Sequence, residues 1–144
     1  MSVAELKYFR DELERIGNKL KEENIRIQDS FDDIGPEGFS NILNLFLELS
    51  ELAGDLGAKE YKRYFDGFAE VTSYCLKVNN VRAHKKVAMM SLDYQALLQG
   101  LIDGFQQEDK IKAIVKAFEV QIFKQERLKR GEFFSLVNEK SLRA

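Results

Sequence analysis

The sequence predicts an all-α protein, a single-domain antiparallel bundle of about five helices with a long N-terminal helix. Along most of the chain, apolar residues recur at the spacing that places them on one face of a helix. No segment shows the alternation of apolar and polar residues that is typical of a half-buried strand. The 144 residues contain a single proline, Pro36, whereas irregular loops recruit proline for its fixed backbone angle.

Length and composition are those of one globular domain. A chain of 144 residues can bury about two-thirds of its unfolded surface, and 44% hydrophobic with 32% charged residues is not the composition of a disordered chain. We divide the domain, residues 1–144, into a long amphipathic helix over 1–34, a bundle core over 35–130, and a short C-terminal helix or tail over 131–144.

The first segment has the pattern of a long amphipathic helix. Ser2 and Glu5 have the spacing of a capping box, in which each side chain satisfies a free N–H at the helix start. A row of apolar residues at seven-residue intervals follows: Leu6, Leu13, Leu20, Ile27 and Ile34. Two interpretations are open: the helix lies along the bundle with this row in the core, or Leu6, Leu13, Leu20 and Ile27 form the face of a coiled-coil homodimer or a partner-binding arm.

Four more helices are expected, over residues 36–54, 58–78, 81–103 and 108–130. The second starts with Pro36, a residue favoured at the first helical position, and it is apolar on nearly all sides, which predicts a central position. The third carries an aromatic stripe that is typical of a core. After Gly131 we expect a short helix or tail that docks back through Phe133, Phe134 and Val137.

Few residues carry reactive chemistry. The chain has one cysteine, Cys75, and one histidine, His84, which is too few for a metal site or a nucleophile–base pair, so we expect no enzymatic activity, no cofactor and no metal. Cys75 lies on the aromatic stripe and is expected to be a buried, structural residue. We expect His84 on the surface; the alternative is a phosphoacceptor whose phosphate charge is offset by Lys85 and Lys86.

The net charge of −2 and the pI of about 5.6 argue against a general nucleic-acid-binding protein. A local basic strip nevertheless occurs near the end of the fifth helix: Lys124, Arg127, Lys129 and Arg130. It could contact a partner, or it could be a charged helix end favoured by the helix dipole. A lone cysteine, no membrane-spanning apolar run and no apolar leader together predict a cytoplasmic protein.

A small-residue turn, Ala-Gly-Asp-Leu-Gly-Ala at residues 53–58, separates two amphipathic segments. This hairpin, residues 42–78, is similar to the central hairpin of histidine-containing phosphotransfer domains, in which His-x-Leu-Lys-Gly precedes such a turn. Here Leu47 occupies the phosphoacceptor position, and Ser50 and Glu51 replace the Lys and Gly of the motif. The resemblance implies a helical bundle that keeps a docking face and lacks the usual acceptor histidine.

We therefore predict a non-catalytic regulatory or adaptor protein that binds another protein, such as a signalling component, through a helical face. The expected surface is the first helix together with the basic end of the fifth. Two alternatives are an active phosphotransfer protein that uses His84 and a nucleic-acid-binding protein that uses the basic strip, the second being disfavoured by the acidic total charge.

Overall fold

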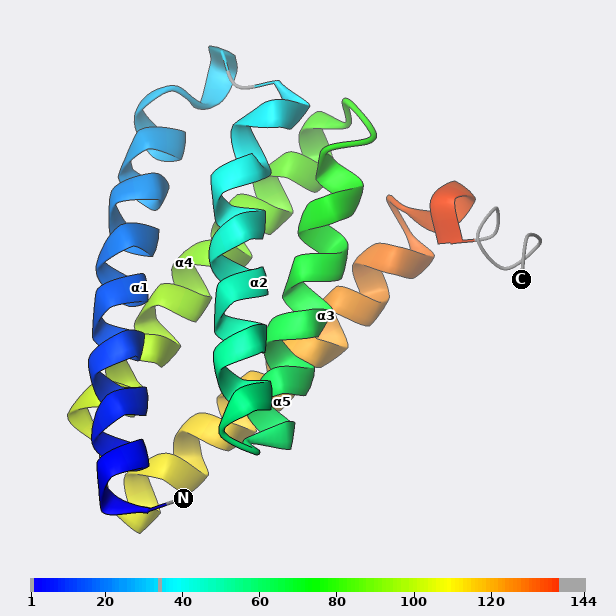
Figure 1. The fold of residues 1–144 in the computed structure, drawn as a ribbon. Coiled ribbons are helices and arrows are strands. Elements are labelled where there is room, and N and C mark those ends of the chain that lie inside the picture. Colours follow the sequence, from blue (N-terminus) through cyan, green and yellow to red (C-terminus); the bar gives the residue numbers. More distant parts are fainter. Residues whose placement is uncertain (1, 34, 138–144) are drawn as a thin grey trace.

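The computed structural model describes residues 2–33 and 35–137 and confirms the all-α class (Figure 1). Its α-helices are α1 (Val3–Asp29), α2 (Ser40–Asp55), α3 (Lys59–Cys75), α4 (Val81–Asp103) and α5 (Glu108–Arg130). Two short 3-10 helices, Phe31–Asp33 and Pro36–Phe39, connect α1 to α2, and no strand occurs in the described residues. Each of these helices is too short or too polar to cross a lipid bilayer.

The five α-helices form a closed ring in the order α1, α2, α3, α5, α4 and back to α1. The chain follows the ring from α1 to α3, crosses to α4, which contacts α3 only slightly, and returns with α5 between α4 and α3. Five elements in a ring cannot alternate in direction throughout, so at least one pair of neighbours must run the same way. Figure 1 shows that α3 and α5 are that pair; the other neighbours are antiparallel.

The predicted helix ends differ from the observed ones mainly around the first loop. The helix α1 ends five residues before its predicted end and α2 starts four residues after its predicted start, because the loop between them folds into the two 3-10 helices. The helix α3 ends three residues early, whereas α4 and α5 have their predicted bounds. Ile34, the last residue of the predicted apolar row, lies outside the described residues.

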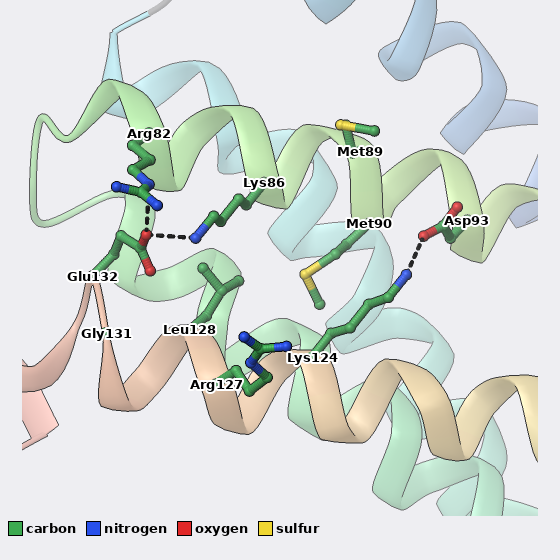
Figure 2. A pocket seen from close by; sticks show the side chains of 10 residues that line it. All are labelled: Arg82, Lys86, Met89, Met90, Asp93, Lys124, Arg127, Leu128, Gly131 and Glu132. Carbon is green, nitrogen blue, oxygen red and sulfur yellow. Dashed lines mark hydrogen bonds and ion pairs between the residues drawn. The ribbon is translucent and has the colours of Figure 1, made fainter.

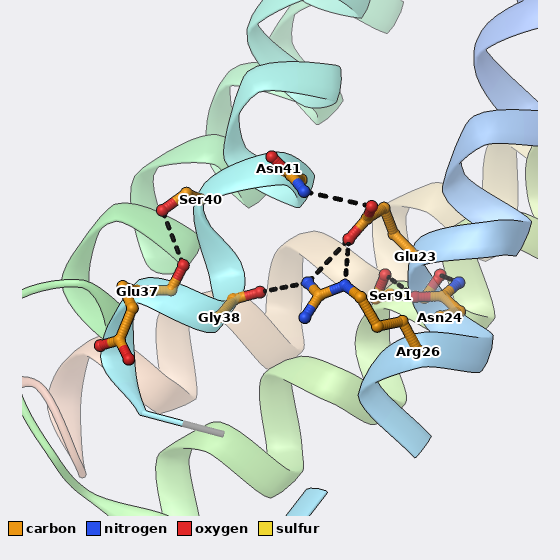
Figure 3. A network of polar contacts seen from close by, with 8 residues as sticks. All are labelled: Glu23, Asn24, Arg26, Glu37, Gly38, Ser40, Asn41 and Ser91. Atoms are coloured by element: carbon orange, nitrogen blue, oxygen red, sulfur yellow. Dashed lines mark hydrogen bonds and ion pairs between the residues drawn. The ribbon is translucent and has the colours of Figure 1, made fainter. Parts of the chain in front are cut away.

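A network of polar contacts holds the loop between α1 and α2 (Figure 3). The Arg26 guanidinium donates to the Gly38 carbonyl oxygen (2.7 Å) and to the Glu23 carboxylate on its own helix (2.7 Å). The side-chain amide of Asn41, in the first turn of α2, donates to the other oxygen of Glu23 (3.2 Å). Glu23, which interrupts the apolar pattern of α1, connects α1 to the start of α2 through these hydrogen bonds.

Asn24 links α1 to α4 from a buried position. Its amide nitrogen donates to Gln95 Oε1 (2.8 Å) and to the Ser91 carbonyl oxygen (3.3 Å), and the Ser91 hydroxyl donates to Asn24 Oδ1. A buried amide that is left unpaired loses its hydrogen bonds to water without replacement. This set of contacts therefore favours one axial alignment of α1 against α4.

An aromatic cluster from four helices occupies the centre of the core, and its members are Phe46, Tyr64, Phe68, Tyr94 and Phe118. The ring centroids of Phe46 and Phe68 are 4.5 Å apart, those of Phe68 and Tyr94 are 4.6 Å apart, and the rings of Tyr64 and Phe118 stack at 4.8 Å. The Tyr94 hydroxyl accepts a hydrogen bond from the Gln125 amide and donates one to the Tyr64 carbonyl oxygen (3.3 Å). Its polar end is thus satisfied inside an apolar core.

Two glycines allow α5 to lie close to its neighbours. A Cβ atom on Gly67 of α3 would lie 2.5 Å from Gln125 Oε1, and one on Gly100 of α4 would lie 3.0 Å from Ile114 Cδ1. Real Cβ atoms are rarely found so close to another heavy atom, so a side chain at either glycine would force the Gln125 or the Ile114 side chain to move.

The apolar row of α1 belongs to the intramolecular core. Leu13, Leu20 and Ile27 are 2%, 0% and 1% exposed, and Leu6 is half-buried. The prediction of a helix lying along the bundle is confirmed. The alternative, a dimer or partner face formed by these residues, is wrong for this fold because α2 and α4 already cover α1.

We expect Leu20→Ala to lower the free energy of unfolding by about 2–5 kcal/mol, because it removes a fully buried side chain and leaves a cavity. The matched control is Leu47→Ala, at a side chain 51% exposed on α2, which should change it by no more than about 0.5 kcal/mol. Urea unfolding followed by circular dichroism measures both. Equal effects of the two variants would contradict the placement of α1.

Candidate functional site

A groove of about 580 Å³ lies between the start of α4 and the end of α5 (Figure 2). The side chains that line it are Arg82, Lys86, Met89, Met90, Asp93, Lys124, Arg127, Leu128 and Glu132, together with Gly131. Four of these side chains are basic and two are acidic. The groove is therefore locally positive on a protein whose net charge is −2.

Helical periodicity brings these residues together. On α4, Arg82, Lys86 and Met90 follow one another at four-residue intervals and so share one face, which is turned toward α5. On α5, Lys124 and Leu128 are likewise four residues apart and face α4. Since α4 and α5 are antiparallel and joined by a short turn, the two rows form the walls of one groove (Figure 2).

Three of the four cations have a carboxylate partner. Glu132, just beyond α5, accepts from Lys86 Nζ (2.6 Å) and pairs with Arg82 Nε (3.2 Å), and Lys124 Nζ lies 3.5 Å from Asp93 Oδ2. The hydrogen bond from Lys86 lowers the pKa of Glu132 below its ordinary value. Glu132 is consequently ionised at neutral pH and occupies one end of the groove as a carboxylate.

Arg127 is the exception among the four cations. No carboxylate of the described residues lies within ion-pair distance of its guanidinium, which is 6.0 Å from the centroid of the Phe123 ring on the same helix. Figure 2 shows the Arg127 side chain directed toward α4. A planar guanidinium offers paired donors that match a carboxylate in two parallel hydrogen bonds, so Arg127 can hold an acidic group that is supplied from outside.

Apolar side chains accompany these charges. Met90 and Leu128 are each 4% exposed and form the floor of the groove, whereas Met89 is 66% exposed and Phe123, on the outer side of α5, is 59% exposed. Methionine adapts its shape to different apolar partners. Arginine, methionine and aromatic residues are the types enriched in protein–protein interfaces.

The predicted basic strip is divided by the geometry of α5. Lys124 and Arg127 line the groove, but Lys129 points to the other side, where its Nζ lies 3.1 Å from Glu70 and 3.1 Å from Glu126. Arg130 is exposed and outside the groove lining. The strip is continuous in the sequence but divided in the fold, and Arg82 of α4 joins its groove half only in the fold, since no local sequence pattern shows which face of α4 lies against α5.

His84 is buried, and the prediction of a surface histidine is wrong. Its ring is 3% exposed, lies 5.0 Å from the Phe39 ring, and places Nε2 3.0 Å from the Val78 carbonyl oxygen and 3.3 Å from that of Cys75. A carbonyl oxygen can only accept, so Nε2 carries a hydrogen and donates to the carbonyl of Cys75, the last residue of α3, and to that of Val78 in the loop before α4. The ring caps the end of α3, where backbone acceptors have no helical partner.

Cys75 is fully buried on α3, as predicted. Burial raises the pKa of its thiol to about 12, because the thiolate would lose its hydration. The thiolate is the nucleophilic form, so this geometry fits the expected structural role.

The hairpin that resembles a phosphotransfer domain is present as α2, a turn and α3. The turn is a Schellman motif: the Ala58 N–H bonds the Ala53 carbonyl oxygen (2.8 Å), the Gly57 N–H bonds that of Gly54 (3.1 Å), and Gly57 has a φ of 75°. Leu47, at the position of the acceptor histidine, is exposed.

Ser50, within this hairpin, has two charged neighbours. Lys62 Nζ donates to Ser50 Oγ (3.1 Å) and to Asp66 Oδ2 (2.9 Å), and Ser50 in turn donates to Asp66. The three side chains join α2 to α3.

Within residues 2–33 and 35–137, no group of three or more His, Cys, Asp or Glu side chains is placed to hold a metal ion. Comparisons of the chain with protein-family models, with curated proteins and with solved structures gave no match.

We expect His84→Ala to lower the free energy of unfolding by about 1–3 kcal/mol, because the carbonyl groups of Cys75, at the end of α3, and of Val78, in the next loop, lose their donor inside the protein. Lys85→Ala, at the exposed neighbouring position, is the control and should change it by about 0.5 kcal/mol or less. Urea unfolding measures both values, and a wild-type midpoint for His84→Ala would contradict the capping role.

The Cys75 thiol should stay unreactive in the folded protein even at about pH 9, where an ordinary cysteine is largely ionised, since its pKa is about 12 in the fold. The rate of modification by Ellman's reagent checks this. We expect the rate to follow the population of unfolded protein as urea is added. A fast reaction in the absence of urea would show that the thiol is accessible.

Proposed function

We propose that this protein is a non-catalytic regulatory or adaptor protein that binds an acidic segment of another protein in the groove between α4 and α5. The observation that supports this proposal most directly is the guanidinium of Arg127, which has no carboxylate partner among residues 2–33 and 35–137. It lies in a groove that the exposed Met89 also lines and where basic side chains outnumber acidic ones.

Charge complementarity indicates the sign of the partner. A concentration of basic side chains on an otherwise acidic protein attracts an acidic segment locally, and opposite charges across an interface fix orientation and accelerate association. A basic segment would meet Arg82, Lys86, Lys124 and Arg127 as like charges. The partner segment therefore carries Asp or Glu side chains.

The shape and apolar content of the groove indicate the form of the segment. A volume of about 580 Å³ is in the range of sites that enclose several side chains. The groove runs between two antiparallel helices, and amphipathic helices commonly bind such grooves through a few apolar anchors. We expect apolar anchors of the partner to contact Met89, Met90 and Leu128 while its acidic side chains reach Arg127 and Lys124.

This proposal keeps one half of the surface expected from the sequence. The basic end of α5 contributes Lys124 and Arg127, but α4 takes the place of the first helix, whose apolar row is buried. Burial of His84 argues against its use as a phosphoacceptor, because a transferred phosphoryl group would require access to a ring that caps α3.

Selection from a library of displayed random peptides, each about 16 residues long and so able to form a helix of about 24 Å, tests the proposal. Wild-type protein should enrich peptides that combine Asp or Glu with Leu, Met or Phe. The double variant Lys124→Glu/Arg127→Glu should bind the selected peptides at least about tenfold more weakly, since it reverses two charges in the groove.

The control variant is Lys112→Glu/Lys116→Glu, which makes the same charge change at exposed positions of α5 outside the groove lining. It should retain most of the affinity. Peptides without acidic enrichment, or equal losses in the two double variants, would contradict a binding site in the groove. The nucleic-acid alternative would be favoured by a different result: no peptide is enriched, and the protein binds DNA in a salt-dependent way that Lys124→Glu/Arg127→Glu abolishes and the control does not.

A further inference from the structure

We propose that Arg82 and Lys86 form a subsite for a carboxylate of the bound segment, and that Glu132 occupies this subsite in the free protein as an internal stand-in for that group. This inference rests on the proposed function and specifies how the same groove selects its partner. It predicts that binding exchanges one carboxylate for another on the same two cations.

Glu132 reaches the groove from outside the two helices that build it. Its Oε1 atom lies 2.6 Å from Lys86 Nζ and 3.2 Å from Arg82 Nε, and its side chain is only 12% exposed. Arg82 and Lys86 are one helical turn apart on α4, so both can contact a single carboxylate (Figure 2). The contacts show that this end of the groove accepts a carboxylate with two donors.

The two cations stay accessible while Glu132 is bound. The side chains of Arg82 and Lys86 are 79% and 44% exposed, so an incoming acidic group can approach them from solvent before Glu132 leaves. Exchange of partners in this way keeps a carboxylate on the two cations throughout.

Departure of the Glu132 carboxylate requires no unfolding. The next residue, Phe133, is fully buried, its ring lies 5.3 Å from that of Tyr74, and its N–H bonds the Leu128 carbonyl oxygen (3.1 Å). These contacts anchor the backbone beyond α5 while the Glu132 side chain rotates about its own bonds. The backbone thus keeps Glu132 beside the subsite, and rotation of the Glu132 side chain is enough to free Arg82 and Lys86.

The exchange has a consequence for specificity. A segment with only apolar anchors cannot replace the Glu132 carboxylate on Arg82 and Lys86, so this end of the groove stays closed to it. A segment with an Asp or Glu at the matching position restores both contacts. Glu132 therefore acts as a specificity-determining residue that admits acidic segments and disfavours neutral ones.

The test measures, by calorimetry, how tightly Glu132→Gln and wild type bind the tightest acidic peptide from the selection. Both proteins are also tested with copies of this peptide in which one Glu or Asp at a time is replaced by its amide. Removing the competing carboxylate should tighten binding of the acidic peptide about fivefold. One amide copy should lose this gain, because it no longer has the carboxylate that fills the subsite. Glu126→Gln is the control, since it removes the same charge from α5 at a side chain that pairs with Lys129 outside the groove.

Tighter binding by Glu132→Gln alone supports the inference. Unchanged or weaker binding by Glu132→Gln, or an equal gain in Glu126→Gln, overturns it while the effect of Lys124→Glu/Arg127→Glu still supports the proposed function. A second measurement uses no peptide: sodium acetate should shift the NMR signal of Arg82 Nε in Glu132→Gln and not in wild type. Equal shifts in both proteins would also overturn the inference, and failure of the peptide selection itself would count against the proposed function.

Discussion

The contacts of Tyr94 are the constraint on which the rest of this bundle depends. Its ring packs on Phe46 from α2, Phe68 from α3 and Phe118 from α5, so one side chain of α4 meets three of the other helices. Its hydroxyl also needs a polar partner in the middle of an apolar core, and the Gln125 amide supplies it. Because that partner lies on α5, the polar requirement of one core residue favours one rotational setting of α5 about its axis.

The rotational setting of α5 creates the groove. With Gln125 directed inward and Gly67 and Gly100 allowing close approach to α3 and α4, Lys124 and Leu128 are turned toward α4 and Lys129 is turned toward Glu70 of α3. The same setting explains why a basic strip that is continuous along the chain is divided between two faces in space. Packing of the core thus decides which cations can act together.

The groove combines charged side chains from three parts of the chain. Arg82 and Lys86 come from the first half of α4, Arg127 from the end of α5, and Glu132 from the segment beyond it. The groove is lined by more basic than acidic side chains, although the net charge of the whole protein is negative. Local arrangement of charge, and not the total, therefore determines which partner this surface can attract.

The sequence by itself determined the helical class, the approximate helix bounds and the burial of Cys75, because these follow from local periodicity and from the apolar area of single residues. It left two interpretations of the α1 row open, and packing against α2 and α4 decided between them. The tertiary structure alone decided the ring order, the burial of His84 and the pairing of the α4 and α5 cations. His84 illustrates the reason: its local pattern is that of a surface residue, but the carbonyl groups of Cys75 and Val78, at and just after the end of α3, and the Phe39 ring give it a buried site. The hydrogen-bond and ring partners of His84 come from other segments of the fold, so the spacing of residues within one helix cannot predict them.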